Sequence, residues 1–204
     1  MFPYRKVIKA ITGGLVLCLL LSICGVYGQG AGVRKQVVRL HILAHSDSAE
    51  DQTLKLQVRD AVVQAAAGWL DEADTTEEAL ETTRRRLPEL EAVARQVVRE
   101  AGYDYAVTAE QTPAYFTTRQ YDTVTLPAGT YEAVRITIGD GAGQNWWCVV
   151  YPPLCAGAAT DRSDLSTVLD PSQEALVSDG QRYILRFKVL EWLESLLRLF
   201  RATE

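Results

Sequence analysis

The apolar residues of this chain change their spacing at Gly102, and that change constrains the fold more than any other feature. Before Gly102 they recur every three or four residues, as in Leu54, Val58 and Val62, which is the spacing of one helical face. After Gly102 they alternate with polar residues, as from Tyr103 to Ala109, which is the spacing of a half-buried strand. Helices followed by a run of strands predict an α+β fold.

Two helices are expected between residues 48 and 102. The first begins at the N-cap Ser48 and runs to about Leu70. The second begins at the cap Thr75 and ends at Gly102, and Pro88 predicts a kink or a division after Leu87, because proline lacks the backbone N–H. The core stripe of the first helix is predicted at Leu54, Val58, Ala61, Val62, Ala65 and Trp69.

Strands are expected on both sides of the helices. Residues 35–44 predict a strand with one buried face and with His41 on its surface side. A meander of strands follows, with a hairpin-type turn at 139–141. The whole pattern predicts two helices in the amino-terminal half packed on a mainly antiparallel sheet, plus a carboxyl-terminal amphipathic helix. The strands of the meander are predicted at 103–109, 115–121, 123–126, 131–138 and 145–151.

Charge is unevenly distributed. Residues 1–28 hold three of the 21 Lys and Arg residues and none of the 26 Asp and Glu residues, so the rest of the chain carries a net charge of −8. The uncharged stretch from Ala10 to Tyr27 follows a basic start, which predicts either a signal peptide cleaved after Gly28 or an uncleaved membrane anchor. In both cases the remainder is exported. A domain this acidic is not expected to bind nucleic acid.

The exported part divides into four segments. A flexible tether is expected at 29–36, the α+β domain at 37–155, a polar linker at 156–181, and the amphipathic terminal segment at 182–204. The terminal segment is suited to docking on its own domain, in a partner groove or on a membrane surface.

Residues 139–155 combine a glycine-rich turn, two adjacent tryptophans and two cysteines. The glycines indicate a tight turn with positive φ, because a phosphate-binding loop would require a following helix, where a strand is expected here. Trp146 and Trp147 point to opposite faces of that strand. One is therefore expected in the core, and the other outside it, as a partner contact or beneath another segment.

Cys148 and Cys155 are the only cysteines of the exported part, and an isolated pair in an oxidising compartment predicts a disulfide. The alternative is catalysis by Cys148 with His41 or His45 as its base. A disulfide would silence that chemistry, so no catalytic residue is assigned. No metal site or cofactor is expected, because the histidine spacing matches no zinc set and helix capping explains the acidic residues from 47 to 51.

Two long stretches carry a resemblance to a known family. The first is Val38–Val62, which reads VRLHILAHSDSAEDQTLKLQVRDAV, and the second is Asn145–Cys155, NWWCVVYPPLC, with Tyr131–Ile136 before it. In this order and spacing they resemble the stage II sporulation protein R family, over about residues 37–155. The resemblance implies a secreted signalling protein of endospore formation, without catalysis of its own. Such a protein acts between the forespore and mother-cell membranes, where it activates a membrane-embedded aspartic protease that processes the sigma E precursor.

The receptor-binding surface is expected where the turn after the first strand meets the tandem tryptophans. Two other functions stay open: a cysteine hydrolase acting on cell-wall or peptide material, and a cell-wall or carbohydrate-binding module that stacks sugars on a tryptophan. The residues assigned to partner binding are Arg39, His45, Asp47, Asp51, Arg59, Asp60, Trp146 and Trp147.

Overall fold

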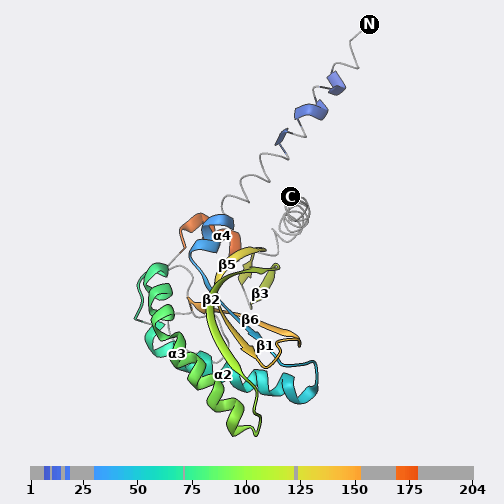
Figure 1. The fold of residues 1–204 in the computed structure, drawn as a ribbon. Coiled ribbons are helices and arrows are strands. Elements are labelled where there is room, and N and C mark those ends of the chain that lie inside the picture. The colour runs from blue at the N-terminus through green and yellow to red at the C-terminus, as the bar shows by residue number, and fades with distance from the viewer. Residues whose placement is uncertain are drawn as a thin grey trace, which may run out of the picture.

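The structure is a computed structural model that describes residues 7–9, 11–14, 17–18, 30–70, 72–121, 124–152 and 169–178. It combines helices with a mainly antiparallel sheet, as the α+β prediction expects, and Figure 1 shows α2 and α3 along one side of the sheet. The order of elements is β1 (Val38–Leu43), α2 (Ala49–Leu70), α3 (Thr76–Glu100), β2 (Val107–Phe116), β3 (Arg119–Tyr121), β4 (Val124–Leu126), β5 (Gly129–Ile138), β6 (Asn145–Tyr151) and α4 (Pro171–Ser178).

The main sheet has the strand order β2-β5-β1-β6, and β3 pairs with β4 in a separate two-stranded sheet. β1 lies parallel to β5 and antiparallel to β6, while β5 lies antiparallel to β2. The turn at 139–141 therefore joins two strands that β1 separates. The predicted hairpin at this turn and the predicted meander are wrong, because alternation identifies a strand without saying which strand it pairs with.

β2 is a single strand where the sequence predicts a break. It pairs with β5 in continuous register along its whole length. The predicted strands 103–109 and 115–121 are thus replaced by one long strand and the short β3. Pro113 is tolerated inside β2 because β2 is an edge strand, where one side of the backbone has no partner in the ladder.

Both long helices begin at their predicted caps, and α3 ends where Gly102 predicts. The Ser48 hydroxyl accepts a hydrogen bond from the N–H of Asp51 at 3.1 Å, and the Thr75 hydroxyl accepts one from Glu78 at 3.2 Å. Gly102 follows α3 with a φ of 86°, a left-handed conformation in which glycine carries no steric penalty. Local chemistry therefore sets the start of both helices and the end of α3.

α3 continues without a break through Pro88, so the predicted division after Leu87 is wrong. Proline removes the donor for the carbonyl of Arg84, four residues earlier. Arg84 and Pro88 are both exposed, and water can satisfy that carbonyl. The packed face of the helix is unaffected.

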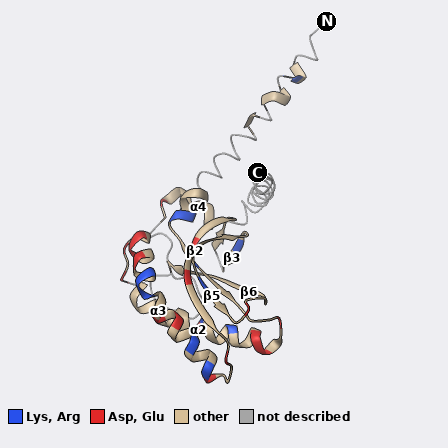
Figure 2. Cartoon of the chain, in the orientation of Figure 1, with Lys and Arg blue, Asp and Glu red and all other residues tan. Residues whose placement is uncertain are grey.

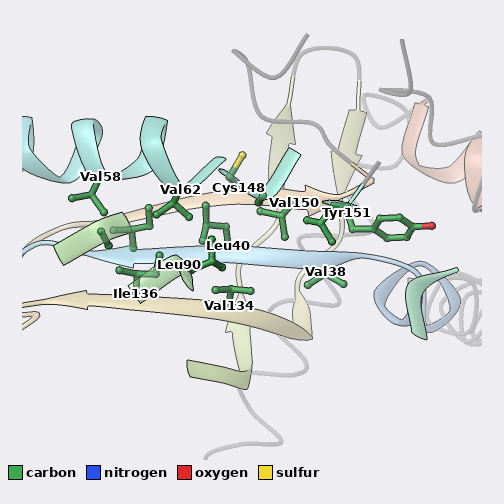
Figure 3. Close-up of a cluster of buried hydrophobic side chains, with 14 of the residues drawn as sticks. Val38, Leu40, Val58, Val62, Leu90, Val134, Ile136, Cys148, Val150 and Tyr151 are labelled. Atoms are coloured by element: carbon green, nitrogen blue, oxygen red, sulfur yellow. The ribbon is translucent and has the colours of Figure 1, made fainter. Parts of the chain in front are cut away.

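One face of the sheet packs against α2 and α3 to form the helix-side core. Figure 3 shows Val58 and Val62 pointing from α2 toward the strand that carries Leu40. The predicted core positions Ala61 and Ala65 are only half-buried, and so is Trp69. The stripe is displaced because α2 turns a row spaced by four residues toward the sheet. This row is Leu54, Val58, Val62, Ala66 and Leu70.

The other face of the sheet is also buried, in what we call the opposite-side core. It includes Phe116 and Tyr131 from the sheet, and residues of β4 and α4 complete it. Arg39 is 0% exposed and His41 is 7% exposed. The predictions that the first strand has one buried face and that His41 lies at a surface are therefore wrong, because β1 is an inner strand covered on both sides.

Two segments that are predicted to be a tether and a linker contain packed helices. Residues 30–35 are helical and Val33 is fully buried, so the tether predicted at 29–36 is wrong over those residues. α4 lies inside the predicted linker at 156–181 and buries Leu176 and Val177. Two apolar residues in a polar stretch are a weak sequence signal, yet they are enough to anchor a short helix on β4.

The terminal amphipathic segment predicted at 182–204 lies outside the described residues, and so does most of the export segment at 1–28. Among the residues that are described, no helix is long and apolar enough to cross a membrane.

Candidate partner-binding site

The loop after β1 (residues 44–48) and the loop after β5 (residues 139–144) fold against each other, and we call this pair the loop junction. The N–H of Gly143 donates a hydrogen bond to the carbonyl of Ala44 at 3.0 Å. The two loops start from neighbouring parallel strands, whose carboxyl ends reach the same edge of the sheet. Topology thus brings together two segments that lie far apart in the sequence.

Side chains predicted to bind a partner hold the loop junction closed. Nδ1 of His45 accepts a hydrogen bond from the N–H of Asp140 at 3.0 Å, and the imidazole stacks on Tyr105 at 4.3 Å between ring centroids. Oδ1 of Asp47 accepts a hydrogen bond from the N–H of Gln144 at 2.6 Å. Both side chains remain partly or fully exposed at their outer edges, so they combine a structural bond with an accessible surface.

Glycine is required at three positions of the second loop. Gly139 and Gly141 have φ values of 57° and 62°, which confirms that these are turn glycines with positive φ. A Cβ atom on Gly143 would lie 2.1 Å from the carbonyl oxygen of Ser46. The loops can approach this closely only because position 143 has no side chain.

Asp51 lies beneath the loop junction with 4% of its surface exposed. The Ser46 hydroxyl donates to Oδ2 of Asp51 at 2.5 Å. This hydrogen bond holds the pKa of the Asp51 carboxyl below its ordinary value, with further bonds from Tyr105 and Ser48 acting in the same direction against the effect of burial. Asp51 thus acts from inside the junction, and its carboxylate is not part of the surface.

We expect Asp51→Asn to lower the free energy of unfolding at pH 7 by about 1–2 kcal/mol, because the carboxylate hydrogen bonds are lost. The folded-state pKa of Asp51 is depressed, so its stabilising contribution is present above the unfolded pKa near 3.8 and is lost as pH falls through the folded value. In urea titrations between pH 7 and about pH 2, the free energy of unfolding of the variant should therefore decrease less with falling pH than that of wild type. Asp104→Asn, at an exposed position, is the control. If the free energy of unfolding falls equally with pH in the two variants, the Asp51 carboxylate does not stabilise the loop junction.

Lys55 belongs to the same site although no sequence pattern indicated it. Its ammonium donates to the carbonyl of Gln144 at 2.9 Å and to Oε1 of Gln52 at 2.5 Å, and its side chain is 4% exposed. Burial lowers the pKa of Lys55. The sequence did not predict this role because a lysine on a helix is ordinarily exposed to solvent. Lys55 is buried only because the second loop lies over it in the tertiary structure.

Trp146 marks the border between the loop junction and α2. Its ring packs against the helix-side core, and the guanidinium of Arg59 lies 4.5 Å from its centroid. Arg59 in turn pairs with the exposed carboxylate of Asp60 at 2.6 Å. Three of the predicted partner-binding residues therefore form one half-exposed group.

Trp147 lies on the other face of β6, in the opposite-side core. Its ring stacks on His41 at 4.6 Å and meets Phe116 edge-on at 4.6 Å. The prediction that the two tryptophans point to opposite faces is confirmed. Neither tryptophan is fully buried and neither is fully outside. Both are half-buried on a sheet that is covered on both sides, which fits the alternative in which the outer one lies beneath another segment.

Arg39 lies in the opposite-side core and is not part of any surface. Its Nε donates to the carbonyl of Cys148 at 3.2 Å, its Nη2 donates to the hydroxyl of Tyr121, and its guanidinium carbon lies 4.0 Å from the centroid of Phe116. Burial lowers the pKa of Arg39. A partner cannot touch this side chain directly, so its role is to position β6.

Comparison with known proteins identifies the family of this chain. A model of the stage II sporulation protein R family matches residues 34–161, which include both loops of the junction and all eight predicted partner-binding residues. The chain belongs to this family. Stage II sporulation protein R of Bacillus subtilis (strain 168) is 42% identical over 120 residues, which are 59% of this chain and 54% of that protein. The match thus spans about half the length of that relative. No solved structure matches.

Membership of the stage II sporulation protein R family supports a role in sporulation. The second family motif also contains Cys148, which is 3% exposed and disulfide-bonded. Its bonding partner lies outside the described residues, so the pairing with Cys155 stays a prediction. In the part of the chain that the structure describes, no group of three or more His, Cys, Asp or Glu side chains is arranged to hold a metal ion.

Proposed function

We propose that this chain is an exported signalling protein of endospore formation that binds and activates a membrane-embedded aspartic protease, which then processes the sigma E precursor. The family membership supports the role in sporulation. The single observation that carries the binding role is the loop junction: the turn in the first family motif folds against the loop that leads into the second, and the outer edge of this site holds His45, Asp47 and Trp146. In this proposal the protein is a ligand, and Cys148 and Cys155 form a structural disulfide.

The two alternative functions have less support in the geometry. A cysteine nucleophile needs an accessible thiolate, whereas Cys148 is buried and bonded. A sugar-binding platform needs an open aromatic face, whereas Arg59 covers Trp146, and His41 stacks on Trp147. A protein ligand uses such half-buried aromatic and arginine groups well, because they bury a large area on binding at little cost in conformational entropy.

The test is co-expression of the full chain with the candidate protease and its precursor substrate, scored by the fraction of precursor cleaved. We expect Trp146→Ala to reduce cleavage by about tenfold or more, because tryptophans at interfaces contribute about 2 kcal/mol or more to binding. Arg59→Ala should have a smaller effect in the same direction. Wild-type protein that fails to cause cleavage would refute the proposed function itself.

Trp69 and Arg86 provide a matched control. Trp69 is also half-buried against the helix-side core, and the guanidinium of Arg86 lies over its ring at 5.8 Å. Trp69→Ala should therefore have a similar effect on folding but leave cleavage unchanged after correction for the amount of folded protein. Equal loss of cleavage in the two variants would mean that Trp146 acts through stability alone.

A further inference from the structure

A groove of about 720 Å³ opens between the amino end of α2 and the carboxyl end of α3. A short connection makes the two helices antiparallel neighbours, so these ends lie at the same end of the molecule (Figure 1). Val97 and Ala101 provide accessible apolar surface in the groove, Tyr103 lies beside them, and Leu54 lines the groove but is 2% exposed. We call this the α2–α3 groove. Its partly apolar lining and its size suit one long side chain of a partner together with the flanking backbone.

The α2–α3 groove is bordered by two carboxylates, those of Glu50 and Glu100. Figure 2 shows acidic residues at the amino end of α2. The ion pairs of the described residues involve neither carboxylate, and Glu100 only accepts a hydrogen bond from the amide of Gln96 at 2.8 Å. A lining that combines apolar residues with two carboxylates outside the ion pairs of the described residues is complementary to a positively charged side chain with an aliphatic stem.

The α2–α3 groove is continuous with the loop junction. Tyr103 stacks on Tyr105 at 5.2 Å between ring centroids, and Tyr105 stacks on His45 at 4.3 Å. A partner that contacts His45 thus needs only to extend along this row of aromatic rings to reach the groove. The two features form a single candidate surface.

We propose that the α2–α3 groove receives an arginine or lysine side chain from an extracytoplasmic segment of the protease, an inference that rests on the proposed function. The aliphatic stem packs on Val97 and Ala101, and the cationic head reaches Glu50 and Glu100. Tyr103 supplies a ring face to the same cation. The net charge of −8 on the chain after residue 28 favours encounter with a basic segment.

The test measures binding of the full chain to the protease in phosphatidylcholine vesicles, which carry no net charge. We expect the double variant Glu50→Lys, Glu100→Lys to bind about tenfold or more weakly, because it places two cations against another cation. The control Glu77→Lys, Glu81→Lys changes net charge equally, and Glu77 occupies the same position in the first turn of α3 as Glu50 does in α2. The control should bind within about twofold of wild type. If the two double variants lose binding equally, or if neither loses it, the proposal is overturned.

A second variant changes the shape of the α2–α3 groove without changing its charge. Thr53 is exposed and lines the groove, so Thr53→Trp should fill it and weaken binding by a similar factor. Unchanged binding by this variant would contradict occupation of the groove. Binding of wild type to the same vesicles without protease would also overturn the proposal, since the occupant would then be the membrane.

A peptide experiment separates failure of the groove from failure of the proposed function. The probe is N-acetyl-Gly-Leu-Arg-Leu-Gly-amide, compared with the same peptide carrying neutral citrulline in place of arginine. We expect the arginine peptide to shift the NMR signals of Leu54 and Tyr103, and the citrulline peptide to shift them less. If wild type does not bind the protease but this difference is seen, the proposed function fails while the cation site stands. Equal shifts from the two peptides would refute the cation site.

Discussion

Replacement of Arg39 by alanine is expected to lower the free energy of unfolding by about 3–5 kcal/mol. The side chain is fully buried against the ring of Phe116, and truncation would leave a cavity there. The carbonyl of Cys148 would lose its donor, and the hydroxyl of Tyr121 would lose the guanidinium that bonds to it. Urea titration of the full chain followed by tryptophan fluorescence measures the effect, with an unchanged m-value if the transition remains two-state.

Two further variants separate the volume of Arg39 from its charge. Arg39→Met keeps most of the volume and removes the cost of burying a cation, so it should recover more than half of the loss. Arg119→Ala is the control, because Arg119 likewise lies near an aromatic ring, that of Trp147 at 5.8 Å, but is exposed. We expect it to change stability by no more than about 0.5 kcal/mol. An Arg39→Ala protein that unfolds at the wild-type urea concentration would contradict the assignment of Arg39 as a positioning residue.

Gly143→Ala is expected to open the loop junction and to cost about 1–3 kcal/mol. The new Cβ would lie 2.1 Å from the carbonyl oxygen of Ser46 and 3.1 Å from the Cβ of Ala44, so backbone must move on one side or the other. The hydrogen bond from the N–H of Gly143 to Ala44 would then lengthen or break. Hydrogen exchange at Gly143 and Gln144 should accelerate more than exchange in the centre of the sheet.

Gly68→Ala is a matched control with the opposite expected sign. Gly68 lies on the exposed side of α2, and a Cβ there would meet nothing within 4 Å. We expect this substitution to stabilise the protein by about 0.5–1 kcal/mol, because alanine has the higher helix propensity. If Gly143→Ala also stabilises the protein, or leaves exchange in the loop junction unchanged, the close approach of the two loops is not required. In the cleavage assay, Gly143→Ala should lose activity and Gly68→Ala should keep it.

Secondary structure was predictable where it depends on neighbouring residues. The caps at Ser48 and Thr75 and the glycine at 102 are satisfied within a few residues of each helix end. Strand alternation was also visible, but it could not reveal that β1 lies between β5 and β6. Pairing depends on contacts between residues that are about a hundred positions apart, and the alternating pattern is the same for either neighbour.

The candidate site was also predictable only where it depends on contiguous stretches of sequence. The first family motif contains the loop after β1, and the glycine-rich turn at 139–141 predicted the loop after β5. The hydrogen bonds that His45 and Asp47 accept from the second loop fit the expectation that the turn after the first strand lies near the tandem tryptophans. Lys55 and Arg39 were different. Lysine and arginine are usually exposed to solvent, so no sequence pattern predicts that these two side chains are buried. The second loop buries Lys55, and β3 and β4 help to bury Arg39.

The sequence by itself determined the class of fold, the limits of the two long helices and the family, because each of these is encoded in local spacing or in contiguous motifs. The tertiary structure alone decided that β1 is an inner strand, that both tryptophans are half-buried, and that a groove lies beside the loop junction. The physical reason is that burial on the second face of a strand depends on what covers it. That cover comes from β3, β4 and α4, whose short and partly polar sequences carry little sign of the packing they provide.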